Sequence, residues 1–131
     1  MAANVNPIFE LTPQAGAQTF VNADATNKKT LITAGAAGFR LDAISICSND
    51  ISAVNLAFYI DIGGTDYYIG NVLVAIGSGY TTVLKVDGLI QLKPAFLNCI
   101  VLPAGALLEC NSVAAVAAAK TVTVVALGGD F

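Results

Sequence analysis

The chain has 131 residues, of which 56% are hydrophobic and only 11% are charged, with a net charge of −3 and neither histidine nor tryptophan. Soluble domains carry about 25% charged residues, so we expect much of this surface to face other subunits in a homo-oligomer or a larger assembly. A compact monomer with an Ala- and Thr-rich surface is the alternative. The six basic residues are scattered, which argues against nucleic acid as a partner.

Residues 1–16 are predicted to form an extended N-terminal arm, because the prolines in this stretch disfavour a helix. It contains the candidate contact residues Pro7, Ile8, Phe9 and Leu11. We expect the arm to lie on a neighbouring subunit or partner. The alternative is a strand on the chain's own sheet, tied down by Phe9 and Leu11. No basic region precedes a long apolar core here, so no secretory signal is expected.

Short strands are predicted over residues 17–21, 29–34 and 39–47. Turn-rich connections of Asn, Asp and Gly lie between them. In the third of these strands Arg40 and Asp42 share a face and can pair.

A hairpin is predicted over residues 53–83 and is the clearest element of the sequence. Leu56, Phe58, Ile60 and Ile62 recur with a period of two, as in a half-buried strand. Gly63-Gly64 supplies the turn, and residues 65–75 supply the second strand, with a bulge or bend expected at Gly70-Asn71. The uncharged run 67–84 contains three glycines and fits two strands and a turn better than a membrane helix of about 20 apolar residues.

Further strands are predicted over residues 80–86, 96–102, 106–111 and 121–127, whereas 89–92 is ambiguous and 114–120 is expected to be a loop or one helical turn. Together these segments make about eight or nine short strands with turns about every ten residues. We therefore expect an all-β, single-domain β-sandwich over residues 17–131, with a jelly roll as the favoured architecture.

No catalytic, cofactor or metal site is expected. Histidine, the commonest general base, is absent. Asp61 and Asp66 flank the hairpin turn and resemble a carboxylate pair or part of a calcium site, but turn-flanking aspartates are the favoured interpretation. Cys47, Cys99 and Cys110 match no zinc spacing and are expected to be reduced, buried thiols. A link between Cys99 and Cys110 would need an oxidising compartment.

Short phrases along most of the chain resemble a family of small proteins encoded among the head genes of tailed bacteriophages and prophages. They are FVNAD at 20–24, TLITAG at 30–35, RLDAI at 40–44, GGTDY at 63–67, LPAG at 102–105 and TVTVVA at 121–126. Proteins of this kind are similar to head decoration, or cement, proteins. The resemblance implies a β-rich module, often a jelly roll, that binds the outer capsid as a dimer or trimer and clamps neighbouring capsomers, in some cases with an N-terminal arm.

The predicted function is therefore that of a non-enzymatic virion protein, made in the host cytoplasm and bound to the capsid exterior. Its expected partners are the phage major capsid protein and further copies of itself, with a trimer favoured over a dimer, and neither nucleic acid nor membrane. The arm and Phe131, at the other end of the chain, are the predicted contacts. The alternative is a tail-associated or fibre-tip module in which Tyr59, Tyr67, Tyr68 and Tyr80 stack on carbohydrate.

Overall fold

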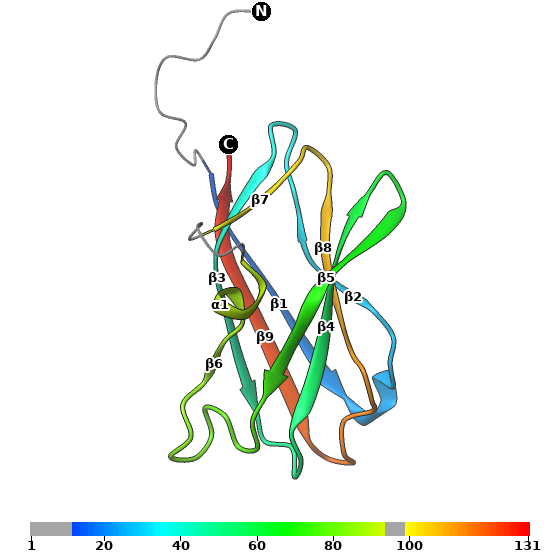
Figure 1. The fold of residues 1–131 in the computed structure, drawn as a ribbon, viewed down its shortest axis with the longest axis vertical. Coiled ribbons are helices and arrows are strands. Elements are labelled where there is room, and N and C mark those ends of the chain that lie inside the picture. The colour runs from blue at the N-terminus through cyan, green and yellow to red at the C-terminus, as the bar shows by residue number, and fades with distance from the viewer. Residues whose placement is uncertain (1–11, 94–98) are drawn as a thin grey trace, which may run out of the picture.

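The computed structural model describes residues 12–93 and 99–131, and within these ranges the chain is an all-β sandwich. The two sheets face each other across one core, and α1 closes one open side between them (Figure 1). The strands are β1 Thr12–Val21, β2 Lys29–Thr33, β3 Phe39–Ser48, β4 Val54–Ile62, β5 Thr65–Val74, β6 Val86–Asp87, β7 Ile100–Leu102, β8 Leu107–Ser112 and β9 Thr121–Asp130, and the short helices are η1 Asn22–Asp24 and α1 Gly88–Leu92.

All the strand pairs of both sheets are antiparallel. Sheet A has the order β1-β9-β3-β6, with β7 also paired to β3, and sheet B has the order β2-β8-β4-β5. Most connections therefore cross from one sheet to the other, and β4–β5 is the hairpin that stays within one sheet.

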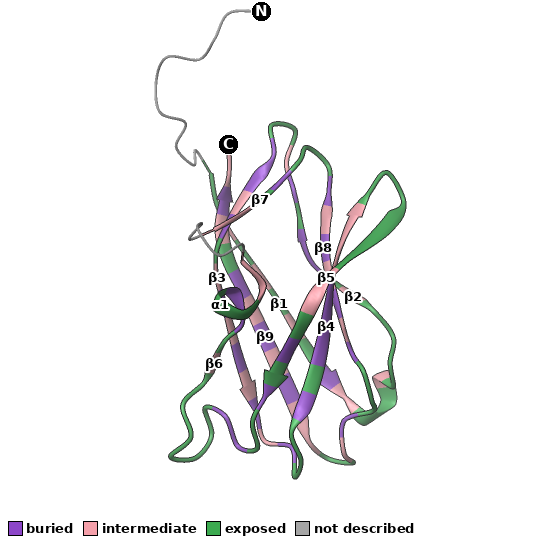
Figure 2. Ribbon diagram, in the orientation of Figure 1, coloured by how far each residue is buried: buried purple, intermediate pink, exposed green. Residues whose placement is uncertain are grey.

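The core forms where the inward residues of the two sheets meet, and buried and accessible positions alternate along the strands (Figure 2). Phe20, Phe39 and Phe58 are its largest fully buried side chains. Each lies on a strand whose neighbours along the chain point the other way, as the period of two requires. Burying an aromatic ring of this size contributes about 1.5–3 kcal/mol of hydrophobic free energy.

The predicted hairpin is confirmed as β4 and β5. Leu56 and Phe58 are buried, but Ile62 is exposed because the hairpin tip extends past the core. The predicted irregularity is also confirmed: Phe58 pairs with Gly70 and Tyr59 pairs with Tyr68, which leaves one extra residue on β5. Gly70 has φ of 146°, a conformation that glycine adopts without strain.

Several predicted boundaries are wrong. β1 begins at Thr12, so residues 12–16 belong to a strand paired with β9 of the same chain and not to the arm. The predicted strand 80–86 is largely an ordered loop, and only Val86 enters β6. Residues 88–92 form the helix α1, which Asp87 caps by accepting a hydrogen bond from the backbone N–H of Ile90.

Other segments agree with the sequence patterns or differ at their ends. The predicted strand 96–102 is β7 from Ile100, its first part lying outside the described residues, and the strand predicted at 121–127 extends to Asp130. Residues 114–120 form a loop, as expected. In the described part of the chain, no helix has the length and hydrophobicity needed to cross a membrane.

Candidate interaction surfaces

The predicted contact residues divide into two groups. Pro7, Ile8, Phe9 and Leu11 lie outside the described residues, so their role stays a prediction. Phe131 is half-buried against its own chain, where its backbone N–H donates to the carbonyl oxygen of Gly38 at 3.2 Å. The neighbouring Asp130 accepts from the backbone N–H of Gly35 at 2.8 Å. The end of the described chain is thus tied to the loop between β2 and β3.

The outer face of sheet A is uncharged over three successive rows of side chains. Strand register places residues of β1, β9 and β3 side by side in each row. The rows are Ala15, Leu127 and Ala43; Ala17, Val125 and Ser45; and Thr19, Thr123 and Cys47. None of these nine side chains is buried, and Leu127 is 45% exposed. The face is therefore a neutral surface of small and aliphatic groups that is open to solvent in the described chain.

Charged residues lie at the borders of this face. At one end Arg40 donates to Asp42, with 2.9 Å between Nε and Oδ1, which confirms the predicted pair. At the β6 edge are Lys85 and Asp87, which line a hollow of about 280 Å³ together with Leu127. The hollow gives the face a recess beside the exposed side chain of Leu127.

The outer face of sheet B has the opposite character. Its three carboxylates, from Asp61, Asp66 and Glu109, lie within 4.8 Å of one another. Lys28 forms an ion pair with Asp66, and Asp61 accepts from the backbone N–H of Gly64 at 2.8 Å. Glu109 joins the two predicted aspartates because β8 pairs with β4, an adjacency that residue spacing does not encode. Local partners for two of the acids agree with the interpretation of Asp61 and Asp66 as structural residues.

The four tyrosines do not gather into one platform. Tyr59 and Tyr68 are cross-strand neighbours on the outer face of sheet B, with ring centroids 5.7 Å apart and ring planes tilted by 58°. Lys28 lies 4.9 Å above the ring of Tyr59 and occupies one of its faces. Tyr67 points away from this pair because it alternates with Tyr68 along β5, and Tyr80 lies in the β5–β6 loop.

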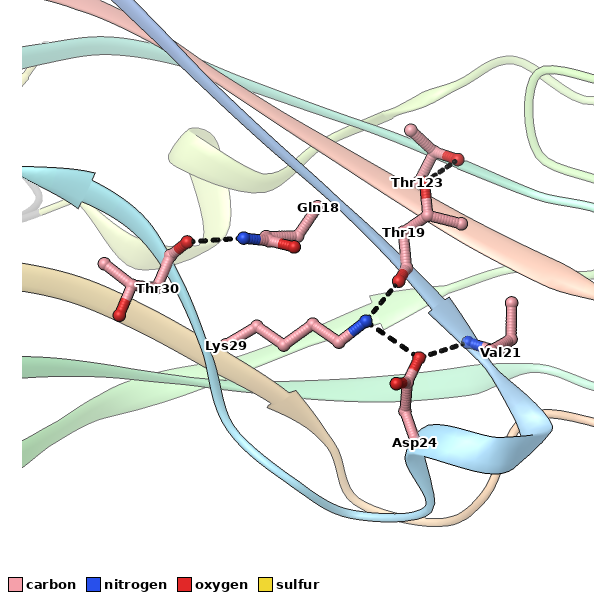
Figure 3. A network of polar contacts seen from close by, with 7 residues as sticks. All are labelled: Gln18, Thr19, Val21, Asp24, Lys29, Thr30 and Thr123. Atoms are coloured by element: carbon pink, nitrogen blue, oxygen red, sulfur yellow. Dashed lines mark hydrogen bonds and ion pairs between the residues drawn. The ribbon is translucent and has the colours of Figure 1, made fainter.

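A network of polar side chains joins the edge strands β1 and β2 (Figure 3). Gln18 donates from Nε2 to the carbonyl oxygen of Thr30 at 2.8 Å, and Lys29 donates to the carbonyl oxygen of Thr19 at 2.7 Å. Lys29 also pairs with Asp24 at 2.8 Å, and Asp24 accepts from the backbone N–H of Val21. Edge carbonyls that could pair with a foreign strand are thus bonded within the chain.

The cysteines are free, as expected. Cys110 is fully buried on β8, and burial raises the pKa of its thiol to about 12. Cys47 and Cys99 are only half-buried, so the expectation of a buried thiol is wrong for these two. A thiol of such high pKa forms little thiolate near neutral pH, so Cys110 acts as a small hydrophobic core residue.

The comparison with family models finds no match to this chain, and none of the curated proteins is similar enough to match it.

Proposed function

We propose that this chain is a non-enzymatic structural protein that decorates a phage capsid, binding its exterior and bridging neighbouring subunits of the major capsid protein. The observation that carries the proposal is the contrast between the two outer faces of one sandwich. Sheet B presents Lys28, three carboxylates and a tyrosine pair, whereas nine side chains on three strands of sheet A include no charge.

A neutral face of this kind is suited to self-association. Bringing it into contact with protein removes apolar area from water, which is worth about 25 cal/mol per Å², without desolvating an unpaired charge. If two copies packed face to face the contact would be isologous and give a dimer. We favour a closed trimer, in which this face contacts a different surface of the next subunit. Several weak contacts around one symmetry axis then combine into firm attachment to a capsid.

The strand order supports a jelly roll as the architecture. If β6 and β7, which both pair with β3, count as one interrupted strand, eight strands remain, four in each sheet. The first and last strands are neighbours in sheet A, and with β6 and β7 taken as one strand every connection except the β4–β5 hairpin crosses from one sheet to the other. This connectivity agrees with the double Greek key of jelly rolls.

A tail-associated module that binds carbohydrate is the second candidate. The exposed ring of Tyr68 beside Asp61, Asp66 and Glu109 favours it, since aromatic stacking and carboxylate acceptors suit sugars. The lysine on the ring of Tyr59 weakens it, because one stacking face is already occupied. Binding to a glycan array, lost in Tyr68→Ala, would favour this candidate over decoration.

Two measurements test the proposal. One is the native mass, from light scattering over a concentration series, and the other is co-sedimentation of the chain with capsids. The probe is the capsid of the phage or prophage whose genome encodes the chain, prepared without this protein. We expect a trimer that co-sediments with the capsid and raises its thermal stability.

The matched variants are Val125→Asp, which puts a charge in the middle of the sheet A face, and Asn71→Asp, which puts one on the exposed outer side of β5. The first is expected to be monomeric and the second to keep its mass, with circular dichroism confirming that both fold. A wild-type chain that stays monomeric and remains in the supernatant when the capsid sediments would contradict the proposal.

A further inference from the structure

The tip of the β4–β5 hairpin exposes apolar side chains on the side that faces the core along the rest of the two strands. Ile60 packs against the core, and Ile62 lies on the same side of β4 two residues later. Tyr67 and Thr65 are their cross-strand neighbours on β5. Ile62 is 47% exposed and Tyr67 is 55% exposed, because the tip extends past the core, as Figure 1 shows. We call these four residues the shelf.

The charged side chains of the hairpin lie on its other side. Asp61 and Asp66 alternate with the shelf residues along β4 and β5, and they meet Glu109 on the outer face of sheet B. Lys28 forms its ion pair with Asp66 on that face. Lys93, which follows α1, lines a separate hollow beside β6. The shelf itself is therefore apolar apart from one threonine hydroxyl, and it suits an apolar segment.

Residues 1–11 are a largely apolar segment that joins the sandwich at the same end as the shelf. β1 begins, β4 ends and β5 begins at this end, at the top of Figure 1. In the sequence of the segment, Phe9 and Leu11 flank Glu10. Alternate residues of an extended segment point to the same side. Phe9 and Leu11 can therefore enter an apolar surface together while Glu10 stays in water.

Phe9 and Leu11 cannot both reach the shelf of their own chain. β1 packs beside β2 at one edge of the sandwich, and β5 lies three strand spacings from β2, which is about 14 Å. Phe9 precedes Thr12 by three residues, so its backbone extends at most about 11 Å from the start of β1, and that of Leu11 about 4 Å. The same segment of a neighbouring copy has no such limit.

We infer that the shelf binds residues 1–11 of a neighbouring copy of this chain, with Phe9 and Leu11 packed on Ile62 and Tyr67. This inference rests on the self-association in the proposed function and adds the segment and the surface of a second subunit contact. Burial of apolar side chains supplies its free energy.

The placement of segment and shelf suits a closed ring. They lie at the same end of the molecule but at opposite edges, the segment at β1 and the shelf at β5. A rotation about an axis along the strands keeps the ends level and brings the segment of one subunit to the shelf of the next. Each subunit then gives one segment and accepts one, and such a heterologous contact closes into a ring like the favoured trimer.

Photo-cross-linking tests which surface the segment contacts. Benzoylphenylalanine replaces Phe9 in the full chain, and the illuminated oligomer is analysed by denaturing gel and peptide mass spectrometry. We expect a band of twice the chain mass, with the cross-link in residues 60–67. Ile62→Asp/Tyr67→Asp should abolish this cross-link. The matched control is Asn71→Asp/Leu73→Asp, which charges two exposed residues on the outer side of the same hairpin and should keep it.

Sedimentation equilibrium measures the strength of the same contact. We expect Ile62→Ala/Tyr67→Ala and Phe9→Ala/Leu11→Ala each to raise the dissociation constant of the oligomer at least about tenfold, as loss of apolar anchors predicts. The two pairs combined should raise it no further than either alone, because both remove one contact. Circular dichroism shows whether each variant folds.

The outcomes separate this inference from the proposed function. A cross-link to residues 60–67 at the mass of a single chain would overturn the inference in favour of the chain's own segment. A cross-link to the major capsid protein alone, or dissociation constants unchanged in both alanine variants, would overturn it while capsid decoration stands. If the wild type is monomeric and does not sediment with capsids, the proposed function fails, and the segment exchange fails with it.

Discussion

At the scale of single residues, Asp24 makes stability depend on pH. Hydrogen bonds from the Lys29 ammonium and from the backbone N–H of Val21 hold the pKa of this carboxyl below its ordinary value of 3.8. A depressed pKa in the folded state stabilises the fold above the unfolded value, and this contribution disappears as the pH falls through the folded value.

We therefore expect Asp24→Asn to unfold at a modestly lower temperature than the wild type at about pH 7, and the difference to shrink as the pH falls below 3.8 and through the folded-state pKa. Thermal unfolding followed by circular dichroism at several pH values measures this. Asp42→Asn serves as the control for net charge, since Asp42 lies in an exposed pair whose loss should cost little. A gap between wild type and Asp24→Asn that persists undiminished in acid would show that the carboxylate charge is not its cause.

At the scale of elements, the seam between β1 and β2 depends on a close approach at Gly16. A Cβ at this position would lie 1.8 Å from the carbonyl oxygen of Leu31, and backbone atoms cannot move aside as a flexible side chain can. The glutamine and lysine bonds across the seam need the same spacing. We expect Gly16→Ala to lower the free energy of unfolding by about 3 kcal/mol, at the upper end of the cost of overpacking.

Chemical denaturation measures this change, and Asn71→Ala is its control. Asn71 is exposed on the outer side of β5, away from both the seam and the sheet A face, so its substitution should change stability by less than about 0.5 kcal/mol. If the two variants had equal free energies of unfolding, β1 and β2 could move apart to accept the added Cβ without loss of stability.

The alternation of apolar and polar residues predicted the strands that have one buried and one accessible side. It failed for segments whose conformation is set by turns or by a short helix. Leu56 and Phe58 alternate with more polar residues, and their strand was predicted almost to its ends. Residues 80–84 are rich in the Thr, Tyr and Val that strands favour, yet turns at Gly77 and Gly79 take them out of the sheets. Residues 88–92 are too few to display a helical period.

The candidate surfaces were less predictable than the strands. Ala17, Ser45 and Val125 are distant in the sequence and become neighbours only because β1, β9 and β3 are adjacent. Strand order is a property of the whole chain, so no window of sequence encodes this row. Composition predicted that a neutral surface should exist but not where it would lie.

At the scale of the whole molecule, the position of the charges determines how association should respond to salt. The nine side chains of the sheet A face are uncharged, and the nearest charges, Arg40, Asp42, Lys85 and Asp87, lie at its borders. The Debye length falls from about 10 Å at 0.1 M to about 3 Å at 1 M, which weakens contacts between exposed charges but leaves apolar burial intact. Sulfate strengthens apolar burial, because it is excluded from protein surfaces.

We therefore expect the native mass of the oligomer to stay constant as sodium chloride rises from about 0.1 M to about 1 M, and its dissociation constant to fall in sodium sulfate. Sedimentation equilibrium at each salt concentration measures both. Lys28→Ala, which removes a charge from the outer face of sheet B, should leave the dissociation constant unchanged. Dissociation with rising chloride would mean that exposed charges carry the subunit contact, because only contacts of that kind are screened in this way. A weaker oligomer in Lys28→Ala would place the charged face of sheet B in the contact.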